Sequence, residues 1–243
     1  MFYRCNLDSI VFKRLFRGEE CEEHLLSFLN SILGQTLNGP LLSAKILNER
    51  TISRLRFADE LDPVNILAST SYFSAIFIEI DFYNSSNSHK FEVWQQASYL
   101  SDIMKNSHNP MYHRSYYINI INYPWHNPSC DDFHTVFMDT DGDTSFLKDV
   151  DGAIDLSFDK DLYSKITPVA EVHTIDVDKY HKIVDKDWEN NLLHRWLSFL
   201  NTLTPDSVLQ NILQISPDFM TIDNRFSDIS LNKESLFFNF RNN

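Results

Sequence analysis

The pattern of hydrophobic and polar positions changes along the chain from helical spacing to strand-like runs and back again. In the first 35 residues, apolar side chains recur every three or four positions, and Asp8 precedes the first of two predicted helices, where it can act as an N-cap. Runs rich in β-branched and aromatic residues then predict strands at 64–68, 75–82, 116–121, 134–138 and 169–177. Beyond Asp187 the spacing is helical again. We therefore expect an α/β fold, with a small mixed sheet flanked by helices and followed by a helical C-terminal region.

The C-terminal part of the chain is expected to form a helical extension. Trp188, Leu192, Trp196 and Leu200 follow one another at nearly helical spacing, which predicts that they are buried on one face of a helix. Residues 91–104 predict a further helix, within the part of the chain that holds the strands. On this basis we divide the chain into an α/β core at 1–180 and a helical extension at 181–243.

The strand at 75–82 carries the clearest candidates for chemistry. Its alternation places Glu79 and Asp81 on the same face. Two carboxylates on a buried strand are costly without a partner, and a hard cation such as Mg²⁺ prefers carboxylate oxygens. The pair therefore predicts a metal site, completed by a polar residue of the neighbouring strand. The alternative is that both side chains lie at a solvent-exposed strand end without a metal, and spacing alone leaves both interpretations open.

Composition and charge narrow the classes of partner. The 243 residues include 34 acidic and 21 basic side chains, for a formal net charge of −13. Proteins bind nucleic acid largely through Lys and Arg, so this chain can bind DNA only through a local basic patch or a bound metal. The same charge favours basic protein surfaces as partners. The chain has 5 Gly and no glycine-rich phosphate loop, which excludes a nucleotide site of that kind.

The remaining motifs indicate an intracellular protein without special metal chemistry. Cys5, Cys21 and Cys130 are odd in number and lack metal-ligand spacing, which predicts reduced thiols. No apolar leader and no long apolar run is present, so we expect no membrane association. The acidic tract at 139–143 has its glycine in the fourth place, whereas an EF-hand loop requires it in the sixth. We interpret that tract as a solvated turn.

Several separate segments match one family in the same order along the chain. They are the helical starts at 8–16 and 25–33, the strand pair that contains Asn65 and Glu79, and the stretches at 171–180 and 187–199. Together they resemble transposase-linked, recombination-promoting nucleases of the PD-(D/E)XK family, from about Asp8 to Arg241. This resemblance implies a PD-(D/E)XK restriction-endonuclease-like core.

The resemblance also implies a site, from which this chain departs. In the family, a strand Asp and the Glu of the next strand hold Mg²⁺, and a Gln or Lys orients the attacking water or the phosphate. Glu79 matches the Glu, but the position fourteen residues earlier is Asn65, and Asp81 stands at the Gln or Lys position. Asp62 could supply a substitute carboxylate, although Pro63 stiffens the backbone between them. The helix at 91–96 lacks the Arg that family members direct at the site.

Two functions follow from this comparison, and we favour the first. The first is a degenerate, catalytically inactive nuclease that acts as a binding or scaffold protein for a protein or ribonucleoprotein and needs no cofactor. The second is an active Mg²⁺-dependent DNA endonuclease with a rearranged site of Asp62, Glu79 and Asp81. If a metal site survives, we expect its ligands to be Glu79, Asp81 and Asn65, with Mg²⁺ as the ion.

Overall fold

A computed structural model describes residues 7–37, 39–47, 63–71, 76–83, 115–122, 132–139 and 170–241. Its six strands form one mixed sheet in the order β1-β2-β3-β4-β6-β5. The strands are β1 (Leu41–Ile46), β2 (Val64–Thr70), β3 (Ile76–Tyr83), β4 (Ser115–Ile121), β5 (His134–Asp139) and β6 (Ala170–Asp176). The helices are α1 (Ser9–Phe16), η1 (Glu19–Cys21), α2 (Glu22–Leu33), α6 (Val177–Lys182), α7 (Leu192–Leu200), α8 (Asp206–Ile215) and α9 (Phe219–Arg241). The predicted α/β fold, a mixed sheet flanked by helices with further helices at the C-terminal end, is confirmed.

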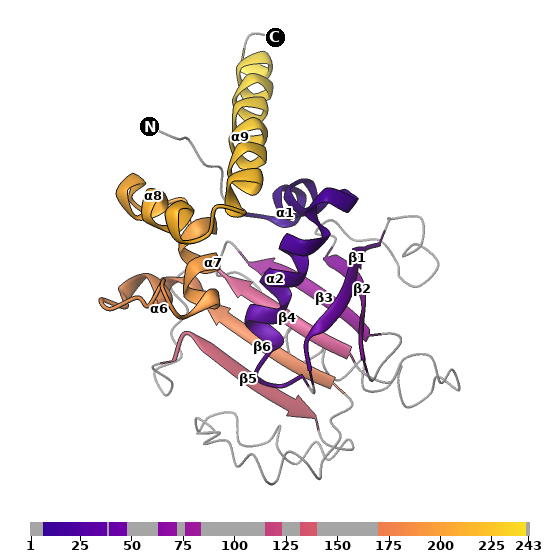
Figure 1. Ribbon diagram of the computed structural model, residues 1–243. Helices are drawn as coiled ribbons and strands as arrows, with labels where there is room; N and C mark the ends of the chain where they lie inside the picture. Colours follow the sequence, from indigo (N-terminus) through magenta and orange to yellow (C-terminus); the bar gives the residue numbers. More distant parts are fainter. Residues whose placement is uncertain are drawn as a thin grey trace. The chain divides into compact units, whose positions relative to one another are not determined.

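The middle of the sheet is parallel. β4 pairs in parallel with β3 on one side and with β6 on the other, whereas β5 runs antiparallel to β6; these four strands lie side by side in Figure 1. β2 is the neighbour of β3 on its other side. The connection from Thr70 to Ile76 is too short for a parallel crossover, so these two strands run antiparallel. The prediction that 64–68 and 75–82 form neighbouring strands is confirmed.

Side-chain alternation gives the paired strands two distinct faces. Glu79 is the register partner of Tyr117, which in turn pairs with Val172. Register partners point to the same side of a sheet, so these residues define one face, which we call the Glu79 face. Tyr116 is the register partner of Glu171. Because Tyr116 directly precedes Tyr117 on β4, the side chains of Tyr116 and Glu171 point to the opposite side of the sheet, which we call the Glu171 face. Any side chain on β3, β4 or β6 can be assigned to a face in this way.

By its internal contacts the chain divides into two compact units. The first unit comprises Met1–Val64 together with Val184–Asn243, and the second is the continuous stretch Asn65–Ile183. The second unit therefore contains β2 from Asn65 onward, β3, β4, β5, β6 and α6, whereas most of the helices belong to the first unit. The expected division into 1–180 and 181–243 stays a prediction.

The first unit has an aromatic core centred on Trp196 of α7, which is 0% exposed. The Trp196 ring centroid lies 4.1 Å from that of Phe219 and 5.8 Å from those of Phe16 and Phe28. Its indole Nε1 donates a hydrogen bond to Ser27 Oγ at 3.0 Å. A buried Trp needs such a partner for its N–H, and here the bond also fixes the ring orientation. One side chain thus joins α1, α2, α7 and α9.

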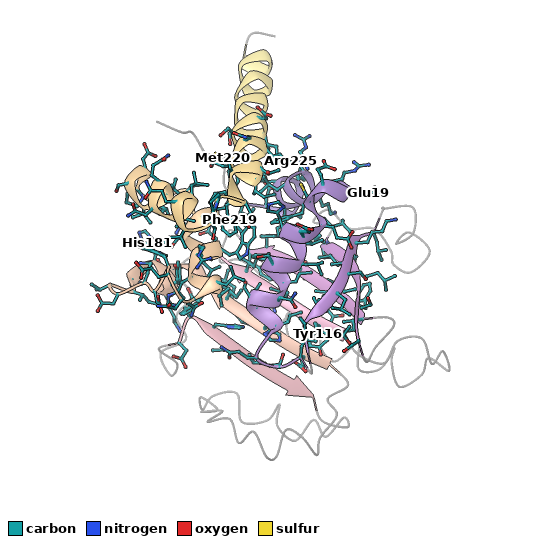
Figure 2. All side chains as sticks on the ribbon, in the orientation of Figure 1. Glu19, Tyr116, His181, Phe219, Met220 and Arg225 are labelled. Carbon is teal, nitrogen blue, oxygen red and sulfur yellow. The ribbon has the colours of Figure 1, made fainter. Side chains whose placement is uncertain are left out.

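A second link within the first unit comes from Arg225 of α9, labelled in Figure 2 beside the segment that begins at Glu19. Its guanidinium donates to Glu20 Oε1 at 3.0 Å and to the Arg17 carbonyl oxygen at 2.8 Å. It also contacts the sulfur of Cys21, which is buried. The rigid fork of donors lets one Arg satisfy several acceptors at once. α9 is therefore attached to the turn between α1 and α2.

The capping prediction for the first helix is confirmed. The backbone N–H of Val11 donates to Asp8 Oδ1 at 2.7 Å, so Asp8 is the N-cap of α1. The expectation for the helix near Trp188 is confirmed in part. Trp196 and Leu200 are buried in α7 as predicted, and Leu192, the first residue of α7, is half-buried. Trp188 is also half-buried, and it lies in the turn before the helix. The reason is a cap: Asn191 accepts from the His194 N–H and starts the helix after Trp188.

Other expectations fall outside the described residues. They are the helix at 91–104, Cys5, Cys130 and most of the acidic segment that begins at Asp139. Across the residues that the structure describes, no helix combines the length and the apolar character needed to cross a membrane.

Candidate functional site

β3 carries both candidate carboxylates, two residues apart on the Glu79 face. Glu79 is 1% exposed. Asp81 is half-buried and accepts a hydrogen bond from Tyr83 Oη at 3.4 Å. The interpretation of the pair as a solvent-exposed strand end is therefore wrong for Glu79. An ionised carboxylate at that depth is costly unless cations or hydrogen-bond donors compensate it, so its surroundings decide what this face can bind.

Asn65 lies on β2, the strand beside β3, and is 2% exposed. The even-numbered positions of β2 are all buried, and those of β3 are buried except for the half-buried Phe82. Since the buried sides of neighbouring strands belong to one side of a sheet, this pattern indicates that Asn65 shares the Glu79 face. Asp62 lies outside the described residues, so its role as a substitute ligand stays a prediction.

Asn119 of β4 is a polar residue of this face that sequence reasoning missed. It is the register partner of Asp81 and is 2% exposed. Its amide oxygen Oδ1 is buried and has no hydrogen-bond partner among the described residues. Neighbouring strands lie about 4.8 Å apart, so the two side chains are adjacent. The sequence did hold a signal, an Asn inside the apolar run at 116–121, but only the strand register shows which carboxylate it meets.

The Glu79 face therefore gathers oxygen donors. Glu79 and Asp81 offer carboxylate oxygens, and Asn65 and Asn119 offer amide oxygens. Hard divalent cations such as Mg²⁺ and Ca²⁺ prefer ligands of this type, so these side chains fit that class of ion. In the part of the chain that the structure describes, no group of three or more His, Cys, Asp or Glu residues could hold a metal ion. Any cation on this face would thus depend on the Asn amides for part of its coordination.

A second polar cluster lies on the Glu171 face, on the other side of the sheet. Glu171 is 1% and His173 0% exposed, and His173 Nε2 lies 3.4 Å from Glu171 Oε2. The other ring nitrogen of His173, Nδ1, lies 3.1 Å from His134 Nε2 on β5. Burial, and then the neighbouring His173, lower the pKa of His134 to about 3, so His134 is neutral at pH 7.

The two contacts of His173 join three side chains of β5 and β6 in one hydrogen-bonded row. A carboxylate oxygen accepts, so Nε2 of His173 donates to Glu171 Oε2. Nδ1 of His173 and Nε2 of His134 share the second hydrogen bond, whose direction is set by the tautomers of the two rings. The carboxylate of Glu171 thus has an imidazole partner within the sheet.

The comparisons with known proteins give one match. The sequence model of a family described as PD-(D/E)XK nuclease family transposase matches residues 7–237. Neither the curated proteins nor the solved structures include a match to the chain.

Proposed function

The chain belongs to the PD-(D/E)XK nuclease family of transposases, and we propose that it is a family member that no longer cleaves DNA. In its place we assign a binding or scaffold role, with a protein or a ribonucleoprotein as the partner. The observation that carries the proposal is Asn65, a buried amide at the position where the resemblance calls for a metal-binding carboxylate.

The loss of one carboxylate weakens the site in two ways. An amide oxygen is neutral, so a Mg²⁺ ion between Asn65 and Glu79 would be held by one negative charge fewer. Cleavage of a phosphodiester depends on a metal that polarises water and neutralises charge in the transition state. A loosely held ion supplies neither at the required position, because productive geometry tolerates displacements of only about 0.5 Å.

Asp81 supports the proposal through the sign of its charge. It occupies the position at which family members carry a Gln or Lys, and Tyr83 Oη donates to its carboxylate. A half-buried anion there repels an approaching phosphate rather than orienting it. The two departures from the family pattern therefore oppose cleavage in different ways. Asn65 weakens binding of the metal, and Asp81 repels the substrate.

The net charge of −13 supports the choice of partner. DNA affinity arises mainly from release of counterions by Lys and Arg. A strongly acidic chain associates more readily with basic proteins, or with the basic protein surfaces of a ribonucleoprotein. DNA stays the partner under the alternative function, an active endonuclease in which Asp62 joins Glu79 and Asp81.

A cleavage assay tests the catalytic part of the proposal. Purified protein with Mg²⁺ or Mn²⁺ is expected to leave supercoiled plasmid and single-stranded DNA uncut, at the background level of a Glu79→Ala variant. The double variant Asn65→Asp/Asp81→Gln is expected to gain metal-dependent cleavage, because it restores the carboxylate and removes the opposing charge. That gain must disappear when Glu79→Ala is added.

One outcome overturns the proposal and promotes the endonuclease. It is robust metal-dependent cleavage by the unmodified chain that Glu79→Ala abolishes. In that case Asp62→Ala should abolish it as well, since Asp62 would be the substitute ligand. Retention of full cleavage in Asp62→Ala would place the catalytic carboxylates elsewhere.

A further inference from the structure

β5 is a terminal strand of the sheet, and its outer edge carries backbone groups that β6 does not use (Figure 1). The Asp176 N–H donates to the Phe133 carbonyl oxygen at 2.8 Å, so Phe133 directs its backbone groups toward β6. This direction alternates along an antiparallel pair, and therefore His134, Val136 and Met138 direct their N–H and C=O groups away from β6. Among the described strands none follows β5 on that side. Each of these residues thus offers a donor and an acceptor to an added strand.

The other terminal strand, β1, differs in that side chains of α2 bind its backbone. Asn30 accepts from the Leu41 N–H at 2.8 Å and donates to the Leu41 carbonyl oxygen at 3.2 Å, and Glu22 accepts from the Ala44 N–H at 3.4 Å. β1 also carries the exposed Lys45, a residue type that discourages pairing with another chain.

β5 carries none of the features that protect a sheet edge. Its sequence, His-Thr-Val-Phe-Met-Asp, contains no Lys and no Pro. It contains no bulge either, because every residue from His134 to Asp139 pairs with β6 in continuous register. An unprotected edge rich in β-branched and aromatic residues is a template for an extended segment of another chain.

The charges at the two ends of β5 favour a basic segment as the added strand. Asp132, which is exposed, lies two residues before the strand, and Asp139 is its last residue. Along an extended chain these two carboxylates lie about 24 Å apart, so Lys or Arg at both ends of a short β-branched run would lie near them. A second copy of the chain is disfavoured at this edge, because two net charges of −13 repel each other.

We propose that the outer edge of β5 binds an extended basic segment of a partner protein, which joins the sheet as an added strand. Backbone hydrogen bonds to His134, Val136 and Met138 supply affinity, and Asp132 and Asp139 select the sign of the partner's charge. The inference rests on the proposed function for its choice of a basic protein as partner, and it adds the surface and the form in which that partner binds.

Fluorescence anisotropy of the full chain with a labelled peptide, Lys-Lys-Val-Thr-Val-Thr-Val-Lys-Lys, tests this edge. We expect saturable binding that added salt weakens, together with slower hydrogen exchange of the Val136 amide in the complex. The same peptide with Glu in place of every Lys should not bind. Equal binding of the two peptides, or no binding of the Lys peptide, overturns the proposal.

Val136→Pro removes an outward N–H without removing a hydrogen bond to β6. It should weaken peptide binding by about tenfold, whereas the matched variant Val136→Thr, which keeps the N–H, should bind within about threefold of the unmodified chain. Undiminished binding by a folded Val136→Pro variant overturns the proposal, and circular dichroism verifies folding. Should the variant not fold, a peptide N-methylated throughout its Val-Thr run decides. It lacks the donors of a strand, so binding as tight as that of the unmethylated peptide overturns the added strand.

Cleavage and peptide binding are measured separately, so the two proposals fail in distinguishable ways. DNA cleavage that Glu79→Ala abolishes would overturn the inactive chain and leave the edge of β5 as proposed. Failure of the peptide to bind would overturn the edge site and leave the absence of cleavage untouched. Self-association of the chain that Val136→Pro abolishes, without any binding of the peptide, would replace the basic partner with a second copy and overturn the proposal.

Discussion

Two glutamates are buried to the same depth on opposite faces of one sheet, and they are stabilised differently. Glu171 of β6 and Glu79 of β3 are each 1% exposed. Glu171 has a nitrogen donor on its own strand, His173, and His173 is in turn hydrogen-bonded to His134 on β5. On the Glu79 face the adjacent positions are Asp81, two residues on along β3, and Tyr117, the register partner of Glu79 on β4.

The difference separates a structural use of a buried carboxylate from a ligand-binding one. A carboxylate that accepts a hydrogen bond from an imidazole N–H is stabilised by the protein alone, and altering it should chiefly change stability. A carboxylate beside a second carboxylate offers oxygen ligands to a hard cation, and altering it should chiefly change binding. Burial alone does not distinguish the two, whereas the chemical type of the neighbours does.

The largest expected effect is on stability at the Glu171 face. His173→Leu leaves Glu171 buried without its imidazole donor, and removal of one partner of a buried pair typically costs about 3–5 kcal/mol. Urea unfolding at pH 7 measures the loss. Adding Glu171→Gln to His173→Leu should recover part of it, because the uncompensated charge is gone. Glu79→Gln in metal-free buffer is the matched variant on the other face, and a loss there as large as for His173→Leu would contradict the comparison.

The next effect is a dependence of stability on pH that arises from His134. Its pKa is lowered from 6.5 to about 3 in the folded chain, so the unfolded chain binds a proton first as the pH falls. The contribution of neutral His134 is therefore complete above pH 6.5 and is lost progressively toward pH 3. At pH 5 the loss is about 2 kcal/mol. Unfolding free energies between pH 7 and pH 5 measure it, before most carboxylates titrate.

His134→Asn provides the control for this dependence. Asn keeps a donor toward His173 but does not titrate, so the slope of stability against pH should fall in this range. An unchanged slope would assign the dependence to other groups.

The smallest effect comes from a third buried carboxylate, Asp176, which is 2% exposed and lies on the Glu79 face at the end of β6. It accepts from the Lys179 N–H at 2.9 Å and caps α6, and burial raises its pKa. Asp176→Ala should cost about 1 kcal/mol, and Asp176→Asn less, because Asn can still cap. Urea unfolding at pH 7 measures both losses. Equal losses in the two variants would mean that the carboxylate contributes more than its cap.

Strands β2 to β6 and the first helix could be predicted because their signals are local, whereas β1 was not among the predicted strands. The apolar run of β3 and the Asp8 cap of α1 depend only on residues close in sequence. Trp188 shows the limit of periodicity, since its spacing fits a helix that Asn191 begins only afterwards. Helical spacing predicts which face a residue would occupy if the helix included it. The position of the N-cap determines whether the helix includes that residue.

From the pattern of residues alone, only the part of the candidate site on β3 could be predicted. Alternation on β3 placed Glu79 and Asp81 together, and the family resemblance supplied Asn65. Asn119 could not be assigned, because β4 is distant from β3 in sequence and a shift of one residue would turn Asn119 to the other face. The same holds for His134, which reaches His173 only through the antiparallel register of β5 and β6.

The discontinuity of the first unit has a consequence for the order in which the chain folds during synthesis. Its core contacts span most of the sequence, from Ser27 to Trp196 and from Arg17 to Arg225, whereas the second unit is one uninterrupted stretch, Asn65–Ile183. Contacts so distant in sequence form late, after the intervening chain has left the ribosome. We therefore expect the strands that carry Glu79, Asn119 and His173 to fold first. Until Trp196 emerges, α1 and α2 would expose their aromatic side chains to chaperones.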